Sequence, residues 1–173
     1  EQAPPKDPFC YTSWSAQAAS VLLEASWKLD RPESAATALS ILDKLDAEAQ
    51  DGHLRHTYDS KGFLEQADGD LLVDWAALLN GLVDAYNQTV GGEHYLERAL
   101  EVANQMVERF GDVARGAFYD VEAFSDAPGY MKVREKPLPE NILAVFGLLK
   151  LSQATLNEEY LDIVGQTLSA YVE

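Results

Sequence analysis

The stretch LVDWAALLNGLVDAY, from Leu72 to Tyr86, decides the fold of this chain. Apolar residues recur in it at every third or fourth position, which is the spacing of one face of an α-helix. That face comprises Leu71, Trp75, Leu78, Leu79, Leu82, Val83 and Tyr86. Since Ala76 and Ala77 widen the face, the helix is apolar over most of its circumference and has to be buried on most sides. We expect it to span about residues 70–90 at the centre of the core.

The pattern of this central helix returns in AVFGLLKLSQAT, residues 144–155, where Gly147 matches Gly81 at a distance of 66 residues. Three amphipathic segments are also alike: EHYLERALEVANQM (93–106), EEYLDIVGQTLSAY (158–171) and the more divergent RPESAATALSILDKL (31–45). The repeated unit is a buried helix, a short turn and an amphipathic helix. Its period exceeds the ~33–47 residues of the common helical solenoids. We therefore expect an all-α protein of three antiparallel helical hairpins packed in an arc.

Six helices are expected within this repeat. Their approximate ranges are 13–29, 32–48, 70–90, 93–110, 139–154 and 158–172. Ser13 is the expected cap of the first helix, and Asn157 that of the last. The expected inward face of the first helix comprises Trp14, Ala18, Val21, Leu22 and Ala25.

The remaining segments are expected to be linkers and short β-structure. Residues 1–12 are predicted to be an irregular linker, and they are followed by a single helical-hairpin repeat domain. That domain covers residues 13–173, with repeats at about 13–60, 61–125 and 126–173. A short strand is expected at His53–Tyr58, and a small β-hairpin is expected to pair Phe118–Val121 with Met131–Val133.

The overall charge restricts the possible partners. The 173 residues include 13 basic and 29 acidic side chains, which gives a net charge of −16. Nucleic acids and anionic membrane surfaces need basic patches, so we expect neither as a partner. No apolar run approaches the ~20 residues of a membrane-spanning helix, and we expect a cytoplasmic protein. The start EQAPPKDPF is typical of an interdomain linker, or of a chain that begins partway through a longer protein.

Metal and cofactor chemistry are not indicated. Cys10 is the single cysteine, so neither an internal disulfide nor a cysteine metal cluster can form. His53 and His56 are three residues apart in the expected strand, where they would point to opposite faces and could not share a metal. The sequence contains no phosphate-binding glycine loop and no Gly-x-Ser-x-Gly motif. We expect no metal and no cofactor.

The segments DGHLRHTYDSKGFLEQAD (51–68), DWAALLNGLVDAY (74–86) and 116–152 resemble the helical domain of the spermatogenesis-associated, thioredoxin-domain-containing proteins. In that family a thioredoxin-like domain precedes a six-hairpin (α/α) toroid of the glycosidase and N-acylglucosamine 2-epimerase kind. The resemblance covers roughly residues 14–171. It implies that the three hairpins form about half of an (α/α)6 toroid. Because half a ring has open ends, we expect a homodimer or a missing N-terminal domain as the partner.

The resemblance also implies positions for a site. Asp74 falls on an acidic position of the family's inner-helix motif, and Asn141 falls on its inner-helix asparagine. Val73 stands where a second acid is common, and the sequence LPE at 138–140 replaces the small residues expected before Asn141. In such toroids a ligand would occupy the central funnel, near the N-termini of the inner helices.

Asp74 and Glu140 are the candidate catalytic pair in that funnel. Glycoside hydrolysis uses two carboxyl groups, ~5–5.5 Å apart for retention or ~6.5–9.5 Å apart for inversion. Aromatic rings can stack on the apolar faces of a sugar, while polar side chains bond to its hydroxyls. The candidate ligand-binding residues are Trp14, Tyr58, Trp75, Tyr119 and Asn141.

Several of these residues also have a structural interpretation. Asp70 is a good helix-capping residue, and Glu140 in a first turn is stabilised by the helix dipole. Trp75 lies on the apolar stripe and fits a core position. Tyr58 and Tyr119 occupy corresponding connectors, where they would serve the packing of the repeats.

Two functions are compatible with these features. The first is a non-catalytic helical scaffold, or the C-terminal part of a longer protein of the thioredoxin-domain-containing family. The second is a carbohydrate-active domain, a glycoside hydrolase or a sugar epimerase, with a carboxylate-lined funnel and a carbohydrate ligand. Val73 in place of a second acid favours the first.

Overall fold

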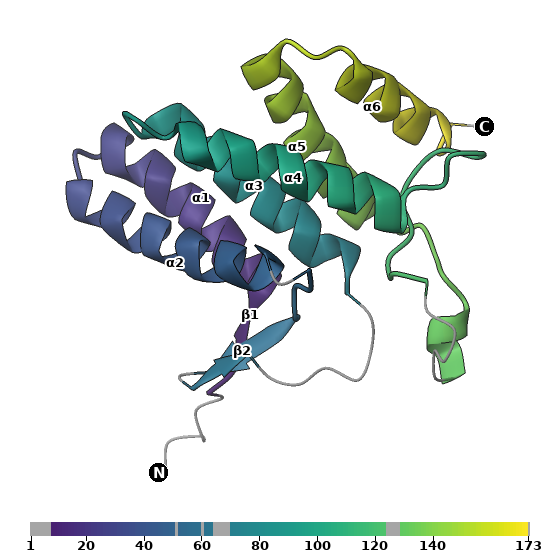
Figure 1. Cartoon of the computed structure of the whole chain (residues 1–173), viewed down its shortest axis with the longest axis horizontal. Coiled ribbons are helices and arrows are strands. Elements are labelled where there is room, and N and C mark those ends of the chain that lie inside the picture. Colours follow the sequence, from purple (N-terminus) through teal and green to yellow (C-terminus); the bar gives the residue numbers. More distant parts are fainter. Residues whose placement is uncertain (1–7, 51, 60, 64–69, 124–128, 173) are drawn as a thin grey trace.

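The computed structural model describes residues 8–50, 52–59, 61–63, 70–123 and 129–172. Within these ranges the chain forms three antiparallel helical hairpins (Figure 1), which confirms the predicted all-α fold. The helices are α1 (Thr12–Lys28), α2 (Pro32–Gln50), α3 (Leu72–Gln88), α4 (Glu93–Phe110), α5 (Leu138–Thr155) and α6 (Glu159–Ser169). In the described part of the chain, no helix has both the length and the apolar character that crossing a membrane requires.

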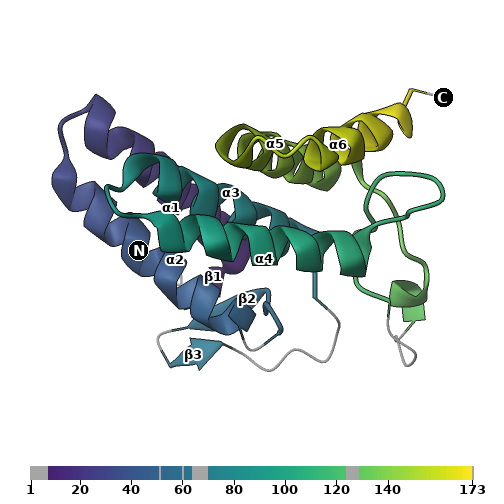
Figure 2. The ribbon, with the colours of Figure 1, turned by 45° about the horizontal axis from the view of Figure 1, so that its top comes forward.

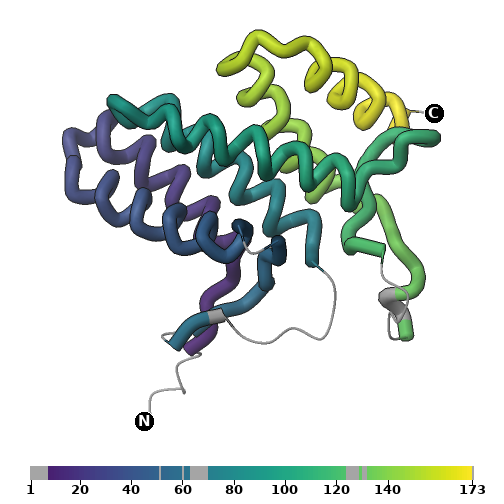
Figure 3. Tube along the Cα trace, viewed as in Figure 1, coloured from purple at the N-terminus to yellow at the C-terminus, as the bar shows by residue number. Residues whose placement is uncertain are grey.

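The hairpins are arranged in two layers. In the inner layer α3 packs between α1 and α5, while α2, α4 and α6 each pack on the inner helix that precedes them (Figure 3). The inner helices begin at the same end of the molecule. The Ser13 N–H in the first turn of α1 donates to Asp74 in the first turn of α3. The Leu72 N–H at the start of α3 donates to the Asp120 carbonyl, in the connector that leads to α5.

The helix α3 is the centre of the core, as its sequence predicts. Every residue from Asp74 to Val83 is buried. The matched glycines allow the inner layer to pack closely. A Cβ at Gly81 would lie 2.5 Å from Leu42 of the preceding hairpin, and a Cβ at Gly147 would lie 2.8 Å from Leu79 of α3. Each glycine therefore lets its own helix approach the hairpin before it.

The buried face of α1 differs from the predicted one. Its buried apolar residues are Ala16, Ala19 and Leu23. Trp14 and Val21, which were expected to face inward, are 69% and 64% exposed, and Ala18 is exposed as well. The prediction was wrong at these positions because α1 lies at the edge of the inner layer. It has two apolar stripes, and α3 covers only one of them.

The helix ends confirm one predicted cap and correct another. The residue in the N-cap position of α1 is Tyr11 rather than Ser13, and it makes no side-chain capping bond. The Ser13 N–H is satisfied from another helix, by the carboxylate of Asp74 at 2.9 Å. At the start of α6, Asn157 Oδ1 accepts the Glu159 N–H at 3.0 Å, as predicted.

A three-stranded antiparallel sheet lies at the end of the hairpins where α1 begins (Figure 1). Its strands, in spatial order, are β1 (Cys10–Tyr11), β2 (Thr57–Asp59) and β3 (Gly62–Phe63). The predicted strand at residues 53–58 is therefore shorter and begins later. Cys10 and Tyr11 do not belong to an irregular linker, because they pair with Tyr58 and Thr57.

The predicted β-hairpin between Phe118–Val121 and Met131–Val133 does not form, and part of its predicted turn lies outside the described residues. Gly129–Lys132 instead make a short 3₁₀ helix, η1. The Asn141 side chain holds the backbone of Phe118, since it accepts the Phe118 N–H at 2.7 Å and donates to the Phe118 carbonyl at 2.9 Å. A partner strand at Phe118 would have to compete with these two bonds.

Candidate functional site

The candidate residues gather at the end of the molecule where the inner helices begin. Trp14, Asp74 and Glu140 lie in the first turns of α1, α3 and α5, respectively. The connector before α3, which carries His56, reaches the same end through its bond to Asp74. Figure 2 shows the small sheet at this end of the hairpins.

Asp74 is fully buried, and both of its carboxylate oxygens face His56. His56 Nδ1 lies 2.9 Å from Oδ2 and 3.2 Å from Oδ1, and Oδ1 also accepts the Ser13 N–H at 2.9 Å. Burial raises the pKa of Asp74, while the hydrogen bonds from His56 and Ser13 and the charge of His56 oppose that rise. Asp74 therefore links the start of α1, the start of α3 and the connector between the first two hairpins.

His56 is the titratable group that Asp74 orients. Its side chain is 31% exposed. Because Nδ1 lies against the Asp74 carboxylate, the neutral imidazole carries its proton on that nitrogen. Nε2 points away from Asp74. The hydrogen bond to Asp74 raises the pKa of His56 above 6.5, partial burial lowers it, and the charge of Asp74 raises it again. The net effect is that the pKa of His56 is higher than that of an ordinary histidine.

Two aromatic rings extend this pair to the surface. The ring centroid of Tyr11 lies 5.2 Å from that of His56 and 4.7 Å from that of Trp14. Trp14 is exposed, and Tyr11 is half-buried. We call these four side chains the His–Asp cluster. It runs from an exposed indole through a phenol and an imidazole to a buried carboxylate.

The sequence predicts two members of the His–Asp cluster, Asp74 and Trp14. The sequence patterns give His56 no catalytic or ligand-binding role, and they place Tyr11 in the linker. A local sequence pattern could not have predicted these contacts, because Asp74 is 18 residues from His56 and 61 residues from Ser13. The pairing of β1 with β2 brings Tyr11 to His56, and that pairing has no strong signal in strands this short.

The two histidines of the connector face different carboxylates. His56 lies against Asp74, whereas His53 Nδ1 is 3.6 Å from Asp70 Oδ1, and its side chain is 66% exposed. In the ranges that the structure describes, no three side chains of His, Cys, Asp or Glu converge as a metal site requires. The two histidines therefore do not share a ligand site among the described residues.

Trp75 occupies a core position. It is fully buried, its indole N–H donates to Asp70 at 3.1 Å, and the Arg109 guanidinium lies 4.9 Å above its ring. Asp70 also accepts from the Leu54 N–H at 3.0 Å and from Arg109 at 2.8 Å. Asp70 therefore holds the connector against α3 and α4, and it is not the helix cap that the sequence predicts.

Three further candidate side chains bond to the protein itself. The Tyr58 hydroxyl donates to Ser15 at 2.6 Å, and the Tyr119 hydroxyl donates to Asp112 at 2.9 Å. Asn141 is fully buried on backbone groups of the connector before α5. These contacts give each of the three side chains a structural role, and the predicted role in ligand binding stays a prediction.

Glu140 and Asp74 have different neighbours. Asp74 reaches toward α1, whereas the charge of Glu140 adds to burial in raising the pKa of Tyr171, just beyond α6. Glu140 Oε2 is buried and has no hydrogen-bond partner among the described residues. The pairing of these two carboxyl groups as catalysts stays a prediction.

Comparison with known proteins identifies the architecture. No protein-family model and no curated protein sequence matches the chain. A cellobiose 2-epimerase from Bacillus thermoamylovorans superposes with a TM-score of 0.80 at 12% identity, over 99% of this chain and 46% of the epimerase. A family 76 α-mannanase from Bacteroides thetaiotaomicron superposes with a TM-score of 0.75 at 17% identity, over 98% of this chain and 46% of the mannanase.

A third neighbour was solved with a sugar bound. It is an inactive variant of a family 76 α-1,6-mannanase from Salegentibacter sp. in complex with α-1,6-mannotriose, with a TM-score of 0.74 at 13% identity over 94% of this chain and 47% of the mannanase. These identities establish the fold alone. The three hairpins form about half of an α/α toroid, and the chain spans about half the length of the neighbours it matches.

Proposed function

We propose that this chain contributes a carbohydrate site to an α/α toroid, and that His56 transfers a proton on the bound sugar. One observation carries the proposal: a partly exposed imidazole is held by a fully buried carboxylate at the end where the inner helices begin. Titratable groups whose pKa is shifted by a specific partner cluster at functional sites, and ligand sites combine aromatic side chains with a few polar groups.

The chemistry of the pair favours proton transfer at carbon over glycoside hydrolysis. Hydrolysis uses two carboxyl groups, whereas the buried carboxyl group here is paired with an imidazole. The mannanase neighbour is inactive when two adjacent aspartates become asparagine, and this sequence contains no two adjacent aspartates. The fold of the cellobiose 2-epimerase is also close to that of this chain, which supports a sugar as the substrate class.

In the proposed step the imidazole takes the proton from the carbon next to the carbonyl of an open-chain reducing sugar. The bonding pair of the C–H bond forms the carbon–carbon double bond of an enediolate, and the negative charge passes to the carbonyl oxygen. Return of the proton to the same carbon from the other face re-forms the carbonyl and gives the epimer. Return of the proton to the neighbouring carbon gives the ketose, provided that the hydroxyl proton of the first carbon moves to the former carbonyl oxygen. Asp74 stabilises the imidazolium that exists between the two transfers. No oxidant or cofactor is consumed.

The aromatic part of the cluster suits the same substrate. Trp14 presents an exposed indole whose neighbour on one side is Tyr11. The C–H faces of a pyranose stack on such rings, and its hydroxyls bond to polar groups at the ring edge. We assign Trp14 to sugar stacking and His56 to proton transfer.

Proton exchange at carbon tests this assignment. D-mannose and cellobiose are incubated in D2O with the protein, and loss of the C2–H signal is followed by proton NMR. We expect exchange with the wild type and a loss of at least about 100-fold in His56→Gln, which is the lower bound of the usual contribution of a general base. His53→Gln is the matched control, because His53 lies in the same connector but faces Asp70. No exchange, or an equal loss in both variants, rejects the proposal.

A second function is favoured by a different observation, the exposed apolar side chains on α1 and α5. They suit a helical scaffold that is completed by other parts of a larger protein. The resemblance of residues 74–86 and 116–152 to the spermatogenesis-associated, thioredoxin-domain-containing proteins supports this second proposal. A chain that binds none of a panel of mono- and disaccharides in a thermal-shift assay, where a ligand at 100 times its Kd adds about 2.7 kcal/mol, would favour the scaffold.

A further inference from the structure

Thr12, the first residue of α1, is fully buried and bonds to the connector on both sides of His56. Its backbone N–H donates to the His56 carbonyl at 2.9 Å, and its hydroxyl donates to the Arg55 carbonyl at 2.5 Å. The Arg55 carbonyl belongs to the peptide group before the His56 Cα, and the His56 carbonyl belongs to the peptide group after it. One residue therefore holds both peptide groups that adjoin the histidine.

Holding both peptide groups restricts the direction in which the imidazole leaves the backbone. Peptide groups are planar, so each residue has only two soft backbone angles, one on either side of its Cα. The two bonds from Thr12 restrain both of these angles at His56. The Cα–Cβ bond of His56 is directed accordingly, and Nδ1 lies 2.9 Å from Asp74 Oδ2.

The next residue of α1 holds the other member of the pair. The Ser13 N–H donates to Asp74 Oδ1 at 2.9 Å. The first N–H groups of a helix have no partner within the helix, and those of Thr12 and Ser13 are bonded to the His56 carbonyl and the Asp74 carboxylate. The bond from the Thr12 hydroxyl is made by a side chain outside the pair, so a substitution can remove it and leave both members of the pair in place.

We propose that Thr12 is a positioning residue of the site, whose hydroxyl fixes the peptide group before His56 so that Nδ1 faces Asp74 and Nε2 faces the substrate. This role rests on the proposed function, in which His56 transfers the proton. A hydroxyl that only helped α1 to pack would stabilise the fold and leave the protonation of His56 unchanged. The hydrogen bond to Asp74 is the largest cause of the raised pKa of His56, so this pKa reports whether the contact is kept.

The titratable groups near His56 lie on several elements, and Thr12 adds no charge to them. Asp74 approaches the imidazole from α3 and Tyr11 approaches it from β1, while the neighbouring Arg55 pairs with Glu48 of α2. Removal of the Thr12 hydroxyl leaves every one of these groups in the chain. A change in the His56 pKa on substitution of Thr12 therefore arises from geometry and not from a lost charge.

NMR titration of the imidazole protons tests the position of His56. Thr12→Val keeps the branched shape and lacks the hydroxyl, and we expect a lower His56 pKa than in the wild type. Thr12→Ala also lacks the hydroxyl, places no methyl group against the Arg55 carbonyl, and should lower the pKa as well. Thr12→Ser retains the hydroxyl and should keep the wild-type pKa.

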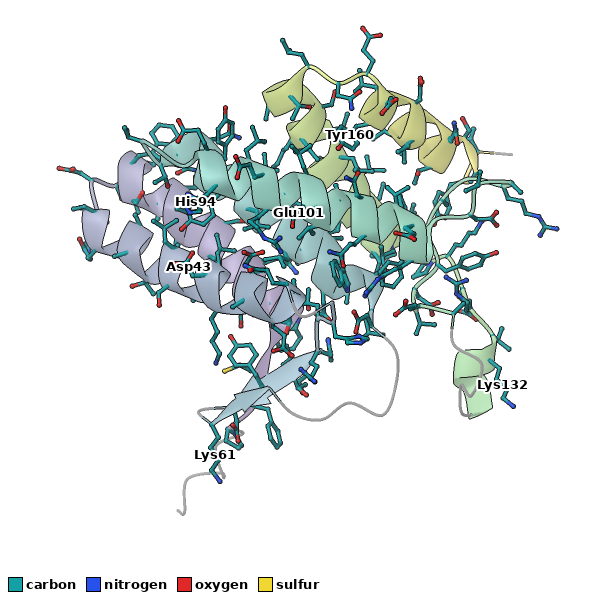
Figure 4. All side chains as sticks on the ribbon, in the orientation of Figure 1. Asp43, Lys61, His94, Glu101, Lys132 and Tyr160 are labelled. Atoms are coloured by element: carbon teal, nitrogen blue, oxygen red, sulfur yellow. The ribbon has the colours of Figure 1, made fainter. Side chains whose placement is uncertain are left out.

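Thr167→Val is the matched control. Thr167 is also buried, and its hydroxyl donates to a backbone carbonyl, that of Ile163, at 2.8 Å. It lies in α6, the helix that carries the labelled Tyr160 in Figure 4, on the opposite side of the molecule from the small sheet. Thr167→Val should lower the urea midpoint, as Thr12→Val does, and leave the His56 pKa unchanged.

Two results of the titration overturn the proposal. The first is a wild-type His56 pKa in Thr12→Val and Thr12→Ala, or an equal change of this pKa in Thr167→Val. The second is unfolding of both Thr12 variants, seen by circular dichroism, under conditions in which Thr167→Val stays folded, because the hydroxyl would then be a requirement of the fold.

The isotope-exchange assay separates the positioning role from the proposed chemistry. Thr12→Val should exchange the C2 proton more slowly, by up to about 100-fold, because a misplacement of about 1 Å can cost that much. Thr12→Ser should exchange it at nearly the wild-type rate. No exchange in the wild type would reject the chemistry alone, since the titration decides the position of His56 independently. A wild-type exchange rate in a Thr12→Val protein with a lowered His56 pKa would overturn the role of Thr12 in the site.

Discussion

At the level of single residues, Asp74 combines two roles that are usually separate. Its Oδ1 accepts the first-turn N–H of another helix, and both of its oxygens lie within hydrogen-bond distance of the His56 imidazole. A fully buried carboxylate is costly unless its oxygens are bonded, and these bonds come from segments that are far apart in the sequence. Asp74 thereby ties the position of His56 to the packing of α1 on α3.

The pair has a predicted pH dependence. His56 has a raised pKa in the folded protein, so its protonation stabilises the fold fully below 6.5, and this stabilisation is lost as the pH rises through the folded-state pKa. We expect the free energy of unfolding of the wild type to decrease as the pH rises from 6.5 through the folded-state pKa of His56. In His56→Gln, which lacks the titrating group, the free energy of unfolding should decrease less over the same pH range. Urea denaturation at a series of pH values measures this free energy, and an identical pH dependence in the two proteins would contradict the prediction.

Asp74→Asn removes the negative charge of the carboxylate and keeps the shape of the side chain. The asparagine can still accept the Ser13 N–H, but it carries no charge to stabilise an imidazolium. We expect the His56 pKa, followed by NMR of the imidazole protons, to be lower in D74N than in the wild type, since the bond to Asp74 is the largest cause of its rise. Asp43→Asn is the control, because Asp43 is an exposed aspartate whose bond is to Tyr95. An unchanged His56 pKa in D74N would mean that the two groups are not coupled.

At the level of elements, the sequence predicts the helices that have a single apolar face, but it does not predict which face of α1 is exposed at the edge of the inner layer. The helix α4 has the predicted limits because one apolar stripe faces the core and an acidic face meets water. The periodicity of α1 predicts a buried Trp14 and Val21, and both are exposed. A helical period shows that a face is apolar, but it does not show which neighbour covers that face. In α1 a second apolar stripe, with Ala16 and Leu23, is the one that packs.

The central helix should be highly sensitive to truncation. Leu78 and Leu82 are both fully buried. Leu78→Ala and Leu82→Ala should each lower the free energy of unfolding by about 2–5 kcal/mol, as buried large-to-small changes do. Val90→Ala is the control at an exposed position beyond the same helix. Chemical denaturation gives the values, and unchanged midpoints for both leucine variants would show that α3 is not central.

The glycines of the helices offer a test of close packing. A Cβ at Gly147 would lie 2.8 Å from Leu79 Cδ2 and 2.9 Å from Leu79 Cγ, so Leu79 would have to move. Gly147→Ala should lower the free energy of unfolding by about 1–3 kcal/mol, which is the usual effect of overpacking. Gly165→Ala in α6 meets nothing within 4 Å and should raise it by up to about 1 kcal/mol through helix propensity. Equal effects at the two sites would contradict the packing role of Gly147.

At the level of the whole molecule, the candidate site depends on contacts that the sequence does not encode locally. The sequence and the resemblance predict two members of the His–Asp cluster as site residues, Asp74 and Trp14. His56 and Tyr11 join it only because two very short strands pair and bring the N-terminal segment across the start of α3. The architecture is encoded in repeated apolar periods, whereas the site is encoded in the connectors, which have no period.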